Sequence, residues 1–470
     1  MQKLFFLATI TFSLLQASTN LIDQKYGSLS LRLRSHYIHW DWKKETAKRV
    51  DNWAMGFGGS LQYQSPSWNN FYTHIGYYFS RNPWHMKRSK IAFVKSGKDM
   101  FCRYKVAKGE GFNIDVLAEA YIGYKTKNSD VQIGRFLFDS IFIKPNDSKM
   151  IPNAFEGISY EWKDEKSRLK FGYLTKQKLR DKTFFHDVIT FGKDLDSDGQ
   201  ISGYEKWREN DDAGSNHALS WVNLKKAHKD TDNKIIVAEY TTKCDPLVLV
   251  INTTVVPDLF GLFAVEPKYT KKYGQWRVFA SARVVLQRDL GAKDIGKLGI
   301  AVANLKGEGD GYKDPYNVDG GLYMAKVGAT KDAWSMQLAY SHALDKADII
   351  DPWRGFPTGG YTRAMAQYNW YANTSTWMLQ AKYDLQAIVP KLQTMIRVSL
   401  QDFDDKKRGV QADANTFEID FLKRFAAYPG LYVKLRLGHT VGESDTKDIT
   451  GQIKPDPSFD ELRFEISYIL

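Results

Sequence analysis

Apolar residues recur at every second position in many segments of this chain. Leu29, Leu31 and Leu33 alternate with polar neighbours near the start, and Trp377 and Leu379 show the same pattern much later. A period of two residues is typical of a β-strand, because successive side chains of a strand point to opposite faces. The sequence therefore predicts an all-β protein whose strands each carry one apolar face and one more polar face.

The connections between these strands are expected to alternate in length. This asymmetry is typical of an antiparallel transmembrane β-barrel, with short turns on the periplasmic side and long loops on the extracellular side. At about 25 residues for each strand with its connection, we expect about 18 strands, a size that leaves an aqueous channel. Residues 361–371 are assigned to a long loop, and strand boundaries within residues 243–270 stay open because Pro257 and Pro267 interrupt the pattern. The expected short turns are 65–70, 126–130, 163–167, 329–332 and 426–430, and the expected long loops are 81–111, 175–216, 289–319, 343–375 and 441–458.

The first residues predict export. A lysine, an apolar run from Leu4 to Leu15 and small residues at Ala17 and Ser18 are typical of a secretory signal peptide, which we assign to residues 1–17. The barrel is then expected to occupy residues 18–470. Mean hydropathy is −0.44 and aromatic residues make up 14% of the chain. This composition suits a membrane barrel, although a large secreted β protein would have it too.

The chain ends in a strictly alternating segment, with Leu462, Phe464, Ile466, Tyr468 and Leu470 on one face. An open sheet edge in lipid would leave backbone groups unpaired, so this segment is expected to pair with the first strand and close the cylinder. The segment resembles the C-terminal strand of bacterial outer-membrane proteins, although the final residue there is most often Phe. The resemblance implies the outer membrane as location, with its lipid and the barrel-assembly machinery as partners.

An unusual connection lies between two alternating strands at residues 131–162. It combines turn-forming residues such as Pro145, Asp147 and Pro152 with many apolar residues, including Phe138 and Phe142. One interpretation is an ordinary hairpin with an apolar loop. The other is a loop that folds back against the wall, which in a barrel would narrow the lumen.

The residues of this connection favour the second interpretation by resemblance. Gly134-Arg135, followed by the run from Pro145 to Gly157, resembles the constriction-loop signature of the OprD-type family of substrate-specific outer-membrane porins. Lys149 stands where that family usually has Arg, which a lysine cannot replace as a bidentate ligand. The resemblance implies a passive channel with a constriction loop at about 137–154. The constriction residues that it implies are Asp147, Lys149, Asn153 and Glu156.

Basic residues are frequent at the positions between the apolar ones, which would face the lumen. Arg283, Arg397, Lys434 and Arg436 are assigned to the pore wall on this phase. A row of guanidinium groups offers an anion a series of charge-assisted contacts, and the basic ladder of the OprD-type family is similar in kind. The expected solutes are therefore small anionic, carboxylate-bearing or zwitterionic molecules. The alternative for each arginine is that it pairs with a loop acid or is simply hydrated.

The segment Asp194–Glu205 follows the spacing of a calcium-binding loop. It has oxygen-bearing residues at alternate positions, a glycine at the sixth position for a sharp turn, and a Glu at the twelfth that can bind through both oxygens. We expect structural Ca²⁺ binding in an outer loop at about 175–216. The predicted ligands are Asp194, Asp196, Asp198, Gln200 (through its backbone carbonyl), Ser202 and Glu205.

Other classes of protein are less well supported by the sequence. It contains no Gly-x-Ser-x-Gly, His-Glu-x-x-His, Walker or Cys-x-x-Cys motif, so we expect no enzyme, and no nucleic-acid partner is expected. A receptor or adhesin that uses long outer loops remains an alternative, as does an outer-membrane hydrolase. Two cysteines, Cys102 and Cys244, are too few for a disulfide framework, and whether they form one bridge stays open.

Overall fold

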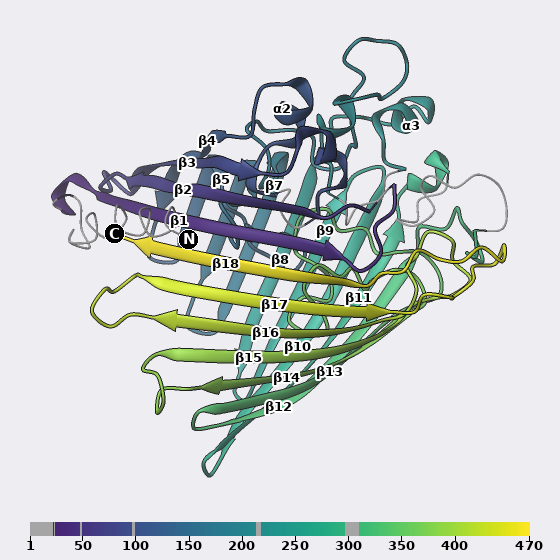
Figure 1. Ribbon diagram of the computed structural model, residues 1–470. Helices are drawn as coiled ribbons and strands as arrows, with labels where there is room; N and C mark the ends of the chain where they lie inside the picture. The colour runs from purple at the N-terminus through teal and green to yellow at the C-terminus, as the bar shows by residue number, and fades with distance from the viewer. Residues whose placement is uncertain (1–21, 23, 48, 96–98, 213–217, 297–309) are drawn as a thin grey trace.

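The computed structural model describes residue 22 and residues 24–47, 49–95, 99–212, 218–296 and 310–470. Within these residues, one 18-stranded antiparallel sheet closes on itself to form a barrel, as the alternation predicts (Figure 1). The predicted signal peptide at residues 1–17 lies outside the described residues. The strands are β1 (Ser28–Trp42), β2 (Asn52–Gln64), β3 (Phe71–His85), β4 (Ile114–Lys125), β5 (Ser129–Phe136), β6 (Ala154–Lys163), β7 (Ser167–Lys178), β8 (Ile235–Cys244), β9 (Leu247–Val256), β10 (Phe260–Tyr273), β11 (Trp276–Asp289), β12 (Gly320–Lys331), β13 (Trp334–Ala343), β14 (Thr374–Asp384), β15 (Leu392–Asp402), β16 (Ala414–Arg424), β17 (Tyr432–Gly442) and β18 (Phe459–Ile469).

The first and last strands close the barrel. β1 pairs with β18 along a continuous register from Arg32 opposite Ile469 to Trp42 opposite Phe459. Backbone bonds between Leu31 and Leu470 extend this seam, with N···O distances of 3.2 and 2.8 Å. The closure therefore satisfies the edge groups of both strands, which is the requirement for a sheet in lipid.

Connections at one end of the barrel are short, and most of those at the other end are long. We call these the turn end and the loop end. The interval 344–373 contains no strand among the described residues, which confirms that 361–371 belong to a loop. Residues 243–270 contain the end of β8, all of β9 and most of β10, and the three-residue connection 257–259 is a short link at the loop end. The outer loop expected at 175–216 in fact spans 179–234, because β7 continues to Lys178.

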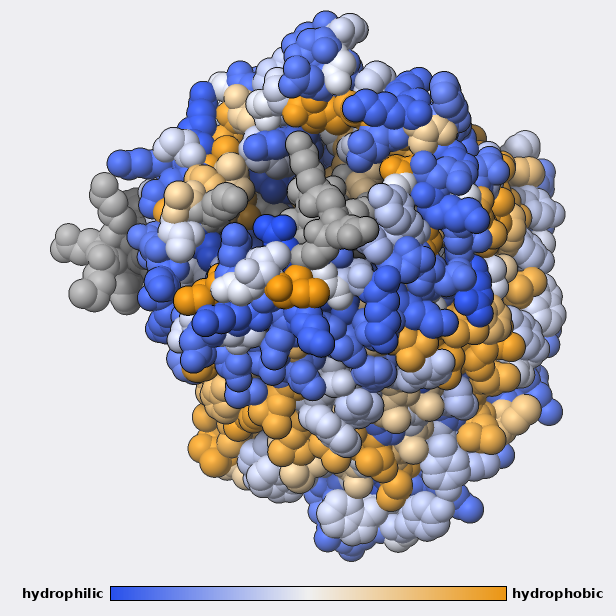
Figure 2. Space-filling model, turned by 90° about the vertical axis from the view of Figure 1, so that its right-hand side faces the viewer, coloured by the Kyte–Doolittle hydropathy of each residue, from blue (hydrophilic) through white to orange (hydrophobic). Residues whose placement is uncertain are grey.

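The outward faces of the strands are apolar. Leu338 on β13 and Leu379 on β14 lie opposite each other in register, and both side chains are exposed on the barrel wall. Exposed aromatic residues such as Trp276 and Trp334 stand beside the turns, as in the interfacial girdle of a membrane barrel. Viewed onto the loop end, the surface is mostly hydrophilic, and hydrophobic residues follow the flank (Figure 2). This is the architecture of a bacterial outer-membrane barrel.

No helix among the described residues is both long enough and apolar enough to cross a membrane. The described helices are short; the first precedes β1 and the others belong to the loops, and the two α-helices lie above the strands in Figure 1. The helices are η1 (Gln24–Tyr26), η2 (Arg88–Phe93), α2 (Arg103–Lys108), η4 (Glu205–Trp207), α3 (Trp221–Lys226) and η5 (Ala292–Ile295).

The two cysteines do not form a disulfide bond. Cys102 is buried in the loop between β3 and β4, and Cys244 is exposed at the turn end of β8. The two residues belong to opposite ends of the barrel, so the barrel height separates them.

If the outer face of the strands contacts lipid, the cost of placing a charge on it should depend on the depth of that position in the membrane. Leu379 lies at mid-strand and Leu247 lies beside a turn, and each side chain is 47% exposed. We expect Leu379→Arg to lower the free energy of unfolding in lipid vesicles by about 2–4 kcal/mol, and the matched control Leu247→Arg by about 0–1 kcal/mol. Denaturant titration followed by tryptophan fluorescence measures both. Equal losses would contradict the placement of these strands in lipid.

Candidate functional site

The connection between β5 and β6, residues 137–153, folds inside the barrel. Phe138, Phe142 and Ile143 are buried in a cluster that also contains wall residues such as Leu174 and Val237. This loop, which we call the constriction loop, therefore packs against the inner wall, and the interpretation as an ordinary hairpin loop in water is wrong. Its predicted extent of 137–154 is one residue too long, because Ala154 begins β6.

Asp147 fastens the constriction loop to β1. Its carboxylate accepts a 2.7 Å hydrogen bond from Nη1 of Arg34 and pairs with the guanidinium of Arg32. Burial alone would raise the pKa of Asp147, but the two arginines lower it below its ordinary value. The carboxylate thus remains charged, and Asp147 acts as an anchor rather than as a member of the cavity lining described below.

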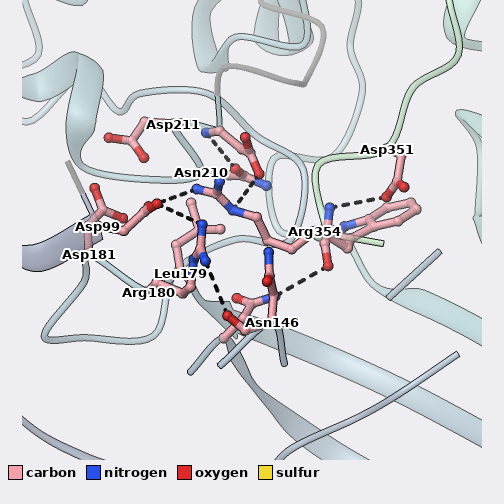
Figure 3. A network of polar contacts seen from close by, with 12 residues as sticks. Asp99, Asn146, Leu179, Arg180, Asp181, Asn210, Asp211, Asp351 and Arg354 are labelled. Atoms are coloured by element: carbon pink, nitrogen blue, oxygen red, sulfur yellow. Dashed lines mark hydrogen bonds and ion pairs between the residues drawn. The ribbon is translucent and has the colours of Figure 1, made fainter. Parts of the chain in front are cut away.

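A buried carboxylate, Asp99, joins the constriction loop to three other loops (Figure 3). Oδ2 of Asp99 lies 2.7 Å from Nζ of Lys149 and 2.7 Å from Nη2 of Arg180, while Oδ1 lies 3.2 Å from Nη2 of Arg354. Burial lowers the pKa of Lys149 to about 7 even though Asp99 opposes this shift. One acid therefore holds basic groups from the constriction loop, from loop 179–234 and from loop 344–373.

Further ion pairs extend this network toward the loop end. Nε of Arg354 lies 2.9 Å from Asp212, and Nη2 of Arg103 lies 2.7 Å from Asp211. Asp212 and Asp99 together raise the pKa of Arg354 above its ordinary value, against the effect of burial. Buried charges persist only when paired, so these contacts fix the loops relative to one another inside the lumen.

A cavity of about 410 Å³, which we call the basic cavity, lies beside this network, and its lining is dominated by positive charge. The only acidic residue among the described lining residues is Asp99. The wall contributes arginines from three strands, and the loops contribute the others. The basic lining residues are Lys95, Arg103, Lys149, Arg180, Arg354, Arg363, Arg397, Arg436 and Arg463.

The wall arginines stand close together. Arg436 on β17 is directly opposite Arg463 on β18, an arrangement of like charges that by itself destabilises a sheet. Neighbouring acids compensate: Nε of Arg436 lies 3.0 Å from Asp420, and Nε of Arg463 lies 2.7 Å from Glu461. Arg397 likewise pairs with Glu418 on β16. Each wall arginine thus has an acidic partner and still borders the cavity.

Arg363 differs from the wall arginines. Its guanidinium carbon lies 4.2 Å from the centre of the Phe356 ring and 5.2 Å from that of Tyr368, and Nη1 donates to the Ala364 carbonyl at 2.9 Å. Among the described residues it forms no ion pair within 4 Å, and burial lowers its pKa to about 10. Arg363 therefore brings a charge into the cavity that no adjacent carboxylate neutralises.

The structure separates the predicted pore residues into two groups. Lys149, Arg397 and Arg436 line the cavity, whereas Lys434 lies nearer the turn end and is 3.7 Å from Asp420. Asn153 is fully buried and donates to the carbonyls of Lys144 and Trp353, so it supports the loop without lining the cavity.

Two pore assignments need correction. Arg283 pairs with Glu266 at 3.1 Å and donates to the Pro357 carbonyl at 3.0 Å, so it anchors loop 344–373. Glu156 pairs with Arg135 at 3.1 Å and lies directly opposite it in the sheet. Arg135 shares the outward phase of Ile133, which is 57% exposed, so Glu156 lies on the outer face. Glu156 also shares the phase of Ile158 on β6, which is 41% exposed, so the strand alternation itself indicates the outer face, and the assignment to the constriction came from the motif resemblance.

Sequence reasoning missed the basic residues that the loops bring to the cavity. Arg180, Arg354 and Arg363 belong to segments without periodicity, so no phase argument could assign them to the lumen. The available signal was compositional only, namely arginines within long loops that also contain many apolar residues.

The predicted calcium loop is compact in the structure. Three carboxylate oxygens, one from each of Asp194, Asp196 and Asp198, lie within 4.8 Å of one another. Glu205 is buried and its two oxygens accept the amides of Leu195 and Ser202 at 2.7 and 3.0 Å. Although the Asp198 amide bonds to Asp196, the surrounding carboxylates raise the pKa of Asp196. The arrangement concentrates negative charge around one point, which is the chemistry that a hard cation requires.

Removal of the Asp99 charge is expected to destabilise the packing of the loops that it joins. Asp99→Asn leaves three buried cations without their shared acid, and we expect a loss of about 3–5 kcal/mol in the stability of the loop packing. Hydrogen–deuterium exchange should then become at least about tenfold faster in residues 137–153. Asp115→Asn is the control, because Asp115 forms an exposed pair with Arg81. Unchanged exchange in Asp99→Asn would contradict the role of Asp99.

Comparisons with known proteins agree with this geometry. No family model and no curated protein matches the sequence. Among solved structures, Acinetobacter baumannii OccAB3 has a TM-score of 0.70 at 14% identity, covering 94% of this chain and 98% of that one. Pseudomonas aeruginosa OccK8 (OprE) has a TM-score of 0.67 at 17% identity, covering 97% and 99%. P. aeruginosa OccK1 (OpdK) has a TM-score of 0.64 at 15% identity, covering 94% and 98%. The chain therefore has the fold of the OprD/Occ outer-membrane channels over nearly its whole length.

Proposed function

We propose that this protein is an outer-membrane porin that admits small anionic, carboxylate-bearing or zwitterionic solutes by passive diffusion. The observation that carries the proposal is the cavity beside the constriction loop, whose lining has many basic residues and one acid. A narrow, low-dielectric space with one sign of charge raises the local concentration of oppositely charged solutes. The shared fold supports the channel, and OpdK, one of the proteins with this fold, has been crystallised with vanillate.

The arrangement suggests how an anion would be handled. Wall arginines such as Arg436 already have an acidic partner, so they offer weak, exchangeable contacts rather than a tight site. Conduction requires binding that is favourable enough for entry and weak enough for exit. Arg363 adds an uncompensated charge at the same place. Together these groups favour the passage of anions over cations without trapping them.

We further propose that the loop Asp194–Glu205 binds a structural Ca²⁺ ion. Support comes from the three aspartates, whose carboxylate oxygens lie close together. Glu205 adds to it, because two backbone amides of the loop already hold its carboxylate in place. The ion would neutralise the repulsion among these carboxylates and so stabilise loop 179–234. We also propose that β18, as the C-terminal strand, is what the barrel-assembly machinery engages during insertion.

Ion selectivity tests the channel proposal. In planar bilayers with a KCl gradient, we expect discrete conductance steps and a reversal potential that shows chloride preference. Arg363→Gln should lower the chloride-to-potassium permeability ratio about twofold, because it removes an uncompensated charge from the lining of the basic cavity.

Two variants control this experiment. Arg363→Lys retains the charge and should retain most of the preference. Arg288→Gln removes an exposed arginine that lies 3.9 Å from Asp319 near the loop end, and it should leave the ratio unchanged. Preference for potassium in the unaltered protein, or absence of conductance steps, would refute the proposal.

Calcium titration tests the loop. Isothermal titration calorimetry of the purified protein, after treatment with EGTA, should show one site, and Asp196→Asn should weaken it at least about tenfold because an ionised ligand is lost. Thermal unfolding should occur at a higher temperature with millimolar Ca²⁺ than with EGTA. Asp230→Asn, at an exposed acid elsewhere in loop 179–234, is the matched control. No heat of binding in the unaltered protein would exclude the site.

A further inference from the structure

A second cavity lies nearer the loop end, outside the basic cavity. It has a volume of about 580 Å³ and opens to the outside, and residues from η2, from α2, from loop 179–234 with the predicted calcium loop, and from α3 line it. Gly199, Gln200 and Ile201 of the calcium loop form one side of it, and Ser220 and Val222 form another. We call it the outer cavity. Neither the constriction loop nor any described strand residue contributes to its lining.

The outer cavity combines apolar surface with positive charge. Phe191, Ile201, Trp207 and Val222 give it an apolar part. Lys206 and Lys226 border the same space, and both are exposed. A lining of this kind suits a solute with an apolar body and an anionic group.

The two lysines are available to a ligand, because among the described residues neither forms an ion pair. Nζ of Lys206 lies 4.2 Å from the centre of the Trp207 ring, a cation–π contact that holds it at the cavity. The other charged groups of the lining are engaged with each other: Arg103 lies 2.7 Å from Asp211. Lysines 206 and 226 therefore carry the charge that an incoming anion would meet first.

The outer cavity adjoins the basic cavity. Ala92 and Arg103 line both of them, so the two spaces are neighbours. A solute held in the outer cavity would be next to the larger set of arginines beside the constriction loop. The positive charge increases along this direction, which favours inward transfer of an anion.

We propose that the outer cavity is a capture site for anionic solutes with an apolar body, and that it loads the basic cavity from the loop end. The proposal rests on the proposed channel function and adds a separate binding step to it. Lys206 and Lys226 supply the charge attraction, and the apolar residues supply selectivity against small hydrophilic anions.

Single-channel recording with benzoate as the probe tests this proposal. Benzoate added to the loop side should cause brief closures of the current. In Lys206→Gln/Lys226→Gln their frequency should fall about fivefold for each lysine, as expected for the loss of a nearby charge in water. Closures caused by benzoate from the turn side should keep their frequency. Lys225→Gln, next to Lys226 on α3 but outside the lining, is the matched control.

The ligand can be varied as well. Acetate and neutral benzyl alcohol should cause closures at least about tenfold shorter than those of benzoate. Acetate lacks the apolar ring, and benzyl alcohol lacks the negative charge. The proposal is overturned if the double variant shows unchanged closure frequency from the loop side, or if acetate produces closures as long as those of benzoate. Chloride preference, measured in the same membranes, separates the two proposals. If the double variant and the unaltered protein both prefer chloride while the closure frequency is unchanged, the capture site is rejected and the channel proposal stands.

Discussion

Backbone hydrogen bonding in the absence of water is the constraint on which this structure depends. Every strand needs partners on both sides, and a sheet in lipid can meet that need only by closing. The pairing of β1 with β18 completes the ring, and the bonds between Leu31 and Leu470 carry it to the last residue. The strict alternation of side chains follows from the same geometry, because one face then meets lipid and the other meets the lumen.

The lumen imposes a second constraint, which concerns charge. Four loops fold toward the same space and bring basic groups into it, and burial of these groups disfavours their charged forms. Asp99 compensates these charges by forming ion pairs with Lys149, Arg180 and Arg354 at once, and Asp212 forms a further ion pair with Arg354. The network fixes the constriction loop while leaving the neighbouring cavity strongly basic. Structural anchoring and the proposed selection of solutes thus depend on the same set of residues.

The predicted calcium loop, the outer cavity and the basic cavity are neighbours. The calcium loop forms a side of the outer cavity, and Arg103 lies between the outer cavity and the basic cavity. Loop 179–234 therefore contributes to each step: it carries the acidic cluster, borders the capture site and supplies Arg180 to the constriction. The length of this loop is explained by these three positions rather than by a single one.

The local period of two was enough to predict the number of strands, the phase of most of them and the closure by the last strand, whereas the constriction loop was predicted from a motif resemblance and the strand boundaries within residues 243–270 stayed open. Lys149, Arg397 and Arg436, which the sequence assigned to the pore, line the basic cavity in the structure. The motif resemblance assigned Glu156 to the constriction although its strand phase is outward, and Arg283 is an anchor only because loop 344–373 folds against that wall residue. The loop arginines that line the cavity, such as Arg354 and Arg363, were decided by tertiary structure alone. Their positions depend on which distant acid and which aromatic ring they meet inside the barrel, and no spacing along the chain encodes such contacts.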